Sequence, residues 1–229
     1  MTPRPLKLLS SMAAREVLAE LVRAFSAETG QMVSAEAAGG VEVAKRVQAG
    51  DEADVVVLAD TAIDKLIAAG ALRAGRVDLV RSGIGIAVRS GAPRPEIGTE
   101  AAVKAAVLAA ASLSYSTGPS GVYLESLFAR WGILESIRPR IVVPPPGTPV
   151  GSLVASGAAA LGFQQLSELM NVAGIEVLGP LPAAIQTITT FSAGISVRCT
   201  QPQLAAQLLS YMCRPAATAV KQRYGLEPA

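Results

Sequence analysis

Short apolar runs alternate along this chain with longer segments in which apolar residues recur at helical spacing. Leu6–Ser10 fits a buried strand, and Ala14–Glu28 then carries its apolar residues on one helical stripe. Met32–Ala37 and Val55–Leu58 repeat the strand pattern, and each leads into another helical one. Alternation of this kind predicts the α/β class, in which a parallel sheet is covered by helices.

A second α/β series follows a long extended segment, Val77–Val88. Its expected elements are helix Thr99–Ala111, strand Leu113–Tyr115, helix Val122–Trp131, strand Ile141–Val143, helix Val150–Ala155 and strand Ala160–Phe163. Another long extended segment, Thr187–Val197, leads to two closing helices, Pro202–Met212 and Pro215–Tyr224. Because the two extended segments flank the second series, we expect two lobes, one of residues 1–82 with 194–229 and the other of residues 83–193.

The composition excludes several classes of protein. Apolar residues make up 51% of the 229 residues and charged residues 17%, which excludes a disordered chain. The net charge is +2 without any basic run, so we expect no nucleic-acid partner. Histidine is absent, which removes Ser-His-Asp systems and histidine-bound metals. Cys199 and Cys213 lack CxxC spacing and could be free or paired, so we expect neither a metal nor a cofactor.

Three long uncharged stretches could suggest a membrane, but residues typical of turns interrupt each of them. The stretches are Ala105–Leu124, Ile141–Ser167 and Val177–Val197, and the second contains the run Pro144-Pro145-Pro146-Gly147. We therefore expect no membrane insertion. The first residues lack the apolar region of a signal peptide, which leaves open a cytoplasmic protein or one whose leader was removed.

Three predicted strand ends run into loops of small or polar residues, each just before a helix. The loops are Ser10-Ser11-Met12, Ala38-Gly39-Gly40-Val41 and Ser116-Thr117-Gly118-Pro119-Ser120-Gly121. In open α/β sheets, ligands bind at the carboxyl ends of the strands. The free N–H groups of a helix start favour an anion. The pattern therefore predicts a small anionic ligand.

Several segments, taken in order, resemble a known family. They are Ala44–Gly50 with Ala53–Asp60, then Thr117–Tyr123, Val150–Phe163 and Pro202–Pro228. Together they resemble the type II periplasmic solute-binding proteins, in particular the molybdate-binding branch, over nearly the whole chain. The resemblance implies an α/β two-lobe (Venus-flytrap) fold with two crossover strands, which closes on a small anion by a hinge. It also implies a monomer in the periplasm that delivers its ligand to an ABC transporter permease.

The chain departs from the molybdate-binding branch at positions that matter for the ligand. Ala13 and Gly40 or Val41 stand where that branch has serines, and Gln164-Gln165 stand where it tends to have a valine–tyrosine pair. Ser10 and Ser11 lie close enough to substitute for the first serine. Two ligand classes therefore remain open, an oxyanion such as molybdate and a small organic carboxylate.

Each candidate residue also has a structural interpretation. Ser10 and Ser11 could cap the following helix, Gly39-Gly40 could form a turn with positive φ, and Arg15 could be a solvated surface residue. Gln164 and Gln165 are costly to bury without partners, which favours a role in binding. The candidate ligand contacts are Ser10, Ser11, Arg15, Gly39, Gly40, Val41, Ser116, Thr117, Ser120, Gly121 and Gln164.

Two other functions fit the same fold. Some proteins that resemble molybdate receptors are isomerases of small unsaturated carboxylic acids such as aconitate. A 1,3-proton shift needs a base, and without histidine the candidates near strand ends are Asp60, Tyr115 and Tyr123. Effector domains of some transcription regulators share the fold too, but no helix-turn-helix pattern precedes Leu6. A solute-binding protein is the leading interpretation.

Overall fold

The computed structural model describes residues 4–145 and 147–229, which form two compact units. Unit 1 comprises Met1–Arg81 and Thr190–Ala229, and unit 2 comprises Ser82–Thr189. Strands β4 (Val77–Arg89) and β8 (Ile188–Ile195) each contribute residues to both units, so the chain passes between the units along these two strands.

Unit 1 is built on a sheet whose strand order is β2-β1-β3-β8. β1 (Leu6–Ser11) runs parallel to both β2 (Val33–Ala38) and β3 (Val55–Ala59), as the sequence predicts. β8 pairs antiparallel with β3. The short strand β9 (Glu227–Pro228) pairs with β4 at Val80 and Arg81 and brings the end of the chain back to unit 1.

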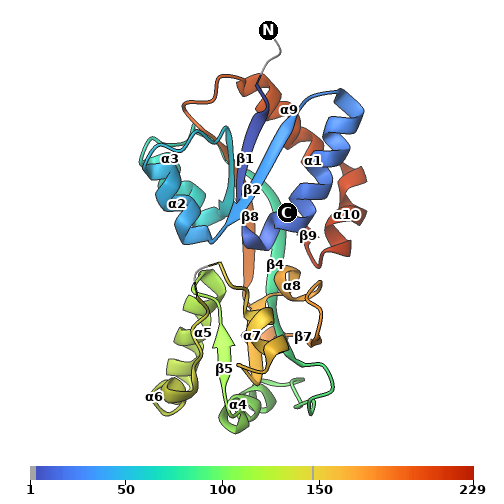
Figure 1. Ribbon diagram of the computed structural model, residues 1–229. Helices are drawn as coiled ribbons and strands as arrows, with labels where there is room; N and C mark the ends of the chain where they lie inside the picture. The colour runs from blue at the N-terminus through green and yellow to red at the C-terminus, as the bar shows by residue number, and fades with distance from the viewer. Residues whose placement is uncertain (1–3, 146) are drawn as a thin grey trace. The chain divides into compact units, whose positions relative to one another are not determined.

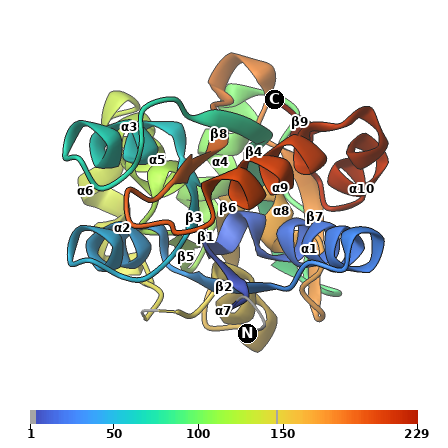
Figure 2. The ribbon, with the colours of Figure 1, turned by 90° about the horizontal axis from the view of Figure 1, so that it is seen from above.

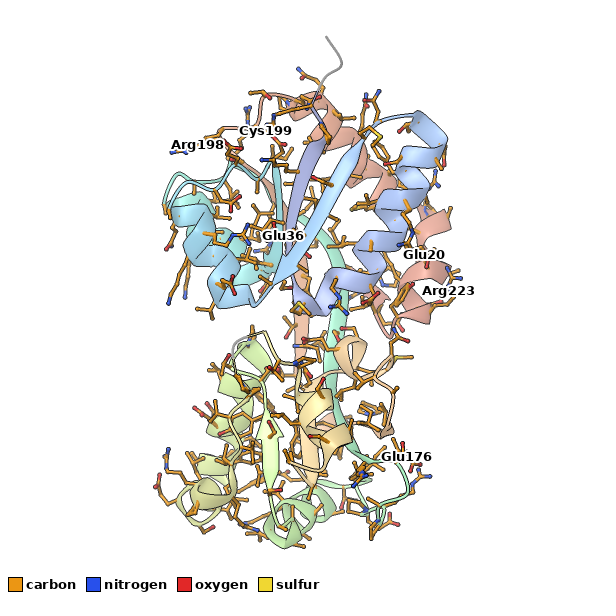
Figure 3. The ribbon with its side chains drawn as sticks, in the orientation of Figure 1. Glu20, Glu36, Glu176, Arg198, Cys199 and Arg223 are labelled. Carbon is orange, nitrogen blue, oxygen red and sulfur yellow. The ribbon has the colours of Figure 1, made fainter. Side chains whose placement is uncertain are left out.

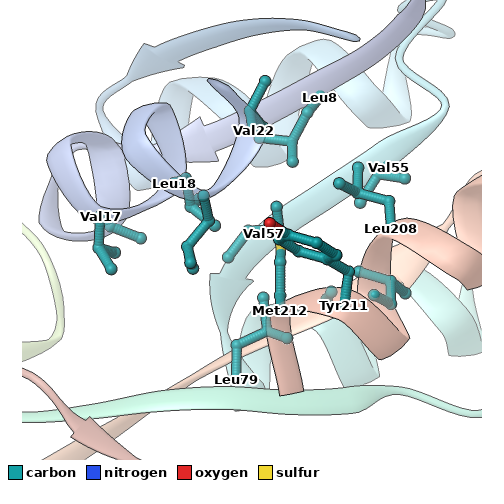
Figure 4. Packing of buried hydrophobic residues seen from close by; sticks show 14 of the residues in the cluster. Leu8, Val17, Leu18, Val22, Val55, Val57, Leu79, Leu208, Tyr211 and Met212 are labelled. Carbon is teal, nitrogen blue, oxygen red and sulfur yellow. The ribbon is translucent and has the colours of Figure 1, made fainter. Parts of the chain in front are cut away.

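Helices cover both faces of the unit 1 sheet (Figures 1 and 2). On one face lie α1 (Arg15–Thr29), α9 (Pro202–Cys213) and α10 (Thr218–Arg223), and on the other α2 (Gly40–Gln48) and α3 (Asp60–Ala68). On the first face, buried side chains from the sheet and the helices pack together, and Figure 4 labels four of them: Leu8, Val57, Leu208 and Met212. On the second face Leu9, Val43 and Ile63 do the same. The apolar stripe predicted for Ala14–Glu28 therefore packs on the sheet.

Side-chain contacts join α1 to the segment around α10 in unit 1. Glu20 of α1 pairs with Arg223 of α10, and Figure 3 shows the two side chains facing each other. The hydroxyl of Tyr224 donates to the same carboxylate at 2.9 Å. These contacts join two helices that lie about 200 residues apart in the sequence.

Unit 2 has a sheet in which β4 pairs antiparallel with β6 (Leu161–Gln165) and β7 (Ile175–Pro180), while β5 (Leu113–Tyr115) pairs parallel with β6. Its helices are α4 (Glu100–Ala109), α5 (Pro119–Arg130), α6 (Leu134–Ile137), α7 (Val150–Ser156) and α8 (Leu166–Leu169). Phe128 of α5 makes edge-to-face contacts with Tyr115 and Phe163, which fixes α5 on the sheet. Short 3₁₀ segments complete the chain at Met12–Ala14, Arg138–Arg140, Ala183–Ile185 and Pro215–Ala217.

The α/β class is confirmed, but two expected elements are wrong. Ile141–Val143 is no strand: it makes one bridge to Leu113, because the prolines that follow have no N–H to extend the ladder. The predicted helix Pro215–Tyr224 is a 3₁₀ turn followed by the shorter helix α10. Pro146 and the first three residues lie outside the described residues. No helix in the described ranges has the length and apolarity that crossing a membrane requires.

Candidate ligand-binding loops

In unit 1, two helices start from the same edge of the sheet. The parallel strands β1 and β2 end side by side, with Ser11 paired to Ala38. β1 then leads through the 3₁₀ turn Met12–Ala14 into α1, and β2 leads into α2, which begins at Gly40. The predicted loops Ser10-Ser11-Met12 and Ala38-Gly39-Gly40-Val41 are thus neighbours at this edge.

The Ser11 side chain lies beside the start of α2. It is buried, with 6% of its surface exposed, and its Oγ has no hydrogen-bond partner among the described residues. Ser11 occupies the capping position of the 3₁₀ turn, yet it makes no capping bond. A Cβ placed on Gly40 would lie 3.8 Å from the Ser11 Cβ. Since an unpaired buried hydroxyl costs about 1–3 kcal/mol, this oxygen is poised for an added partner.

Ser10 is also buried but faces the other way. Side chains alternate along a strand, so Ser10 shares the face of Leu8, which packs in the core beneath α1. Ser11 shares the face of Leu9, toward α2. The structure therefore does not bring the two predicted serines together.

Gly39 and Gly40, at the start of α2, do not form the turn with positive φ that was one interpretation. Gly39 has φ −58° and ψ 135°, and neither glycine is among those with positive φ. A Cβ on Gly39 would meet no atom within 4 Å, so no packing within the protein requires a glycine there. Val41, in the first turn of α2, is 56% exposed. The helix start is therefore open to approach by a ligand.

Arg15 and Asp60, two other candidates in unit 1, interact with their own neighbours. Arg15 is exposed, and its Nε donates to Glu16 Oε1 at 2.8 Å. Asp60 is the first residue of α3 rather than its capping residue, and its Oδ1 accepts from the backbone N–H of Thr61 at 2.6 Å. Arg15 therefore matches its interpretation as a solvated surface residue, whereas an interpretation of Asp60 as the cap of α3 is wrong.

In unit 2, the loop between β5 and α5 is compact. Gly118 precedes α5, and Pro119 is its first residue. The hydroxyls of Ser116 and Ser120 are hydrogen-bonded at 2.8 Å. A Cβ on Gly121 would lie 1.6 Å from the carbonyl oxygen of Ser116, an impossible contact. Only glycine lets the first turn of α5 pack directly on the loop backbone.

A cavity of about 190 Å³ opens beside this loop. It brings together four predicted residues, Tyr115, Ser116, Thr117 and Gly121. The other residues that line the cavity were not predicted from the sequence: Val122, Glu125, Ile141 and Val143. Helical spacing after Gly118 could have indicated Val122 and Glu125, which lie three residues apart on one face of α5.

The two candidate tyrosine bases are both hydrogen-bond donors in the structure. The Tyr115 hydroxyl donates to Glu125 Oε1 at 3.1 Å, and burial raises the pKa of Tyr115 to about 12. The Tyr123 hydroxyl donates to the backbone carbonyl of Ile185 at 2.7 Å. Tyr115 is therefore protonated at neutral pH, and neither phenol is positioned to accept a proton.

Gln164 and Gln165 end strand β6 next to the same loop. Phe163 is paired with Tyr115, so Gln164 and Ser116 follow at matching positions on parallel strands. Both glutamines are 3% exposed. Their Nε2 atoms donate to Glu168 and Thr189, at 2.7 and 2.9 Å, while both Oε1 atoms are buried without a partner in the described part of the chain. Two further buried acceptors thus lie at this strand end.

The family model for bacterial extracellular solute-binding proteins matches residues 6–227. The chain belongs to this family. This solute-binding family member is also 37% identical, over 97% of its length, to an aconitate isomerase from a Pseudomonas species, of which the match covers 87%. The predicted resemblance to the solute-binding proteins, including relatives that are aconitate isomerases, is therefore confirmed.

Solved structures confirm the two-lobe fold. The molybdate-binding protein of Azotobacter vinelandii matches with a TM-score of 0.80 at 23% identity, over 98% of this chain and 99% of that one. The sulfate-binding protein of Mycobacterium tuberculosis matches with a TM-score of 0.77 at 14% identity, over 99% and 88%. A tungstate-binding protein of Desulfovibrio alaskensis matches with a TM-score of 0.69 at 17% identity, over 99% of both chains. At these identities the likeness concerns the fold.

Proposed function

We propose that this solute-binding protein takes up a small organic anion and holds it with uncharged hydrogen-bond donors. The observation that carries the proposal is the buried Ser11 hydroxyl, which has no partner among the described residues. It stands at the start of the segment leading into α1 and beside Gly40 at the start of α2. An anion at this point would accept from the hydroxyl and from the N–H groups that a first helical turn leaves free.

Unit 2 offers a similar set of donors. Thr117 is exposed on the loop before α5, and the hydroxyls of Ser116 and Ser120 lie next to it. Hydrogen bonds to a charged acceptor contribute about 1.5–3 kcal/mol each. Four or five of them would support micromolar binding after ordering costs of several kcal/mol. Cations are not needed for this, and Arg15 is paired with Glu16.

A carboxylate fits the chain better than a bare oxyanion. The relative of 37% identity is an aconitate isomerase, which supports a small unsaturated or hydroxylated carboxylic acid as the ligand class. The positions where molybdate-binding proteins have serines are Ala13 and Gly40 or Val41 in this chain. By analogy with its family, we propose that the protein works as a periplasmic monomer and passes its ligand to an ABC transporter.

Isomerisation of an unsaturated carboxylic acid is the second candidate function, favoured by the same relative. The reaction removes a proton from one carbon and returns it to the carbon two positions away, so it needs one base. Tyr115 and Tyr123 donate hydrogen bonds instead. Glu125, which lines the unit 2 cavity and accepts from Tyr115, is the carboxylate best placed for this role, with Asp60 as the other candidate.

Thermal melting with a panel of anions, beside a turnover assay, separates these functions. The panel contains cis-aconitate, trans-aconitate, molybdate, tungstate and sulfate. A ligand at 100 times its Kd should add about 2.7 kcal/mol of stability. A carboxylate that raises the Tm without being converted supports the binding protein, and conversion of one aconitate isomer into the other, lost in Glu125→Gln, supports the isomerase. If no anion raises the Tm, the proposal is wrong.

A further inference from the structure

Three glutamines of unit 2 differ in how completely their side-chain amides are hydrogen-bonded. Gln186 is fully paired: its Oε1 accepts from the backbone N–H groups of Ile84 and Thr187 at 2.9 and 3.0 Å. Its Nε2 donates to the carbonyls of Ile84 and Leu181 at 3.0 and 3.4 Å. Gln186 therefore shows how a structural glutamine is satisfied in this unit, whereas Gln164 and Gln165 each keep a buried oxygen unpaired.

The orientation of the Gln164 amide is fixed by its partner. Its NH₂ group lies 2.7 Å from a carboxylate oxygen of Glu168, and a carboxylate accepts hydrogen bonds. The amide oxygen must therefore be the unpaired atom. Gln165 lies against the hydroxyl of Thr189, which can both donate and accept, so its amide could turn over. Of the two glutamines, only Gln164 therefore has a fixed amide orientation, with its oxygen as the unpaired atom.

An unpaired acceptor places a demand on the ligand, because only a donor can satisfy it. Molybdate, tungstate and sulfate are dianions whose oxygens accept hydrogen bonds, so they would leave the Gln164 oxygen unpaired. A hydroxyl group on the ligand can donate to it. Gln164 lies near the carboxyl end of β6, level with Ser116 after β5, and this is the end of the strands at which open α/β sheets bind ligands.

We infer that Gln164 is a specificity-determining residue that selects anions carrying a hydrogen-bond donor over bare oxyanions. The inference rests on the proposed function, because it concerns the ligand of the same loops. It assigns to this protein the class of carboxylic acids that carry a hydroxyl group. A buried acceptor left unpaired costs enough to separate two otherwise equal ligands about tenfold or more in affinity.

Titration calorimetry on ligand pairs that differ by one hydroxyl tests the inference. Citrate is compared with tricarballylate, and malate with succinate, with molybdate, tungstate and sulfate beside them. For the unaltered protein we expect the hydroxylated member of at least one pair to bind about tenfold more tightly than its partner and than the inorganic anions. In Gln164→Leu the two members of that pair should bind within about twofold, because the acceptor is gone.

Two further variants control for a loss of stability. Gln186→Leu breaks four hydrogen bonds within unit 2, so it should lower the Tm but retain the preference for the hydroxylated ligand. Gln164→Met, with an unbranched side chain of similar length, replaces Gln164→Leu if the latter fails to fold.

Each other result overturns a separate claim. If the panel of anions for the proposed function and these four acids all fail to bind, the proposed function is wrong. If anions bind but the bare oxyanions or the acids without a hydroxyl bind as tightly, the inferred ligand class is wrong while the binding function stands. If the preference is present and survives in both Gln164 variants, the assignment to Gln164 is wrong.

Discussion

Replacing Gly121 by alanine should destabilise the protein, whereas the same change at Gly39 should not. The added Cβ at position 121 would lie 1.6 Å from the carbonyl oxygen of Ser116, so the loop or the first turn of α5 must shift. Overpacking of this kind costs about 1–3 kcal/mol or more. For a chain of this length, each kcal/mol lowers the Tm by about 2–4 °C. We therefore expect Gly121→Ala to melt about 2–12 °C below the unaltered protein.

Gly39→Ala is the matched control, since it also adds one methyl group at the start of a helix on a predicted binding loop. Its φ of −58° suits alanine, and its Cβ would meet no atom within 4 Å. Restricting the unfolded chain should then add about 0.4–1 kcal/mol of stability. Thermal unfolding followed by circular dichroism measures both variants. Equal melting temperatures for the two would refute the assignment of Gly121 to a close backbone contact.

Two further predictions concern charge. Burial alone would raise the pKa of the Asp54 carboxyl, but hydrogen bonds from Arg4 and from the Lys7 backbone N–H outweigh it and hold that pKa below its usual value of 3.8. The ionised Asp54 therefore stabilises the fold above its unfolded-state pKa, and this stabilisation is lost as the pH falls through the lower folded-state pKa. In Asp54→Asn, the free energy of unfolding measured by acid titration should therefore depend less on pH below about pH 4. Because the proposed donors are uncharged, the ligand affinity measured by calorimetry should change little when the salt concentration is raised or when Lys45 is replaced by alanine. A large loss of affinity from either change would indicate a cationic site.

The sequence predicts the parallel core of unit 1 and the position of the three loops, because both follow from local patterns. Apolar runs such as Val55–Leu58 indicate buried strands, and helix starts after strands indicate where anions bind. Ser11 and Gly40 are found this way, and the structure brings them to adjacent positions. The register of β1 and β2, which the sequence leaves open, produces this proximity.

Features that depend on contacts between distant segments were not predictable in the same way. Val143 lines the unit 2 cavity because Leu113 pairs with Ile141, almost 30 residues further along the chain. The glycine at position 121 is required by the loop carbonyl it approaches rather than by its own backbone angles. Which of the two serines faces α2 follows from which face of β1 is covered by α1. Each of these is a consequence of tertiary packing.

The central claim is that the Ser11 hydroxyl is kept for a ligand rather than for the fold. Ser11→Ala removes a buried oxygen that has no partner in the described ranges, so the Tm without ligand should stay the same or rise. The affinity for the bound anion should fall about tenfold or more, because a hydrogen bond to a charged acceptor is lost. Calorimetry and thermal melting on this one variant give both numbers. A lower Tm with unchanged affinity would contradict the claim.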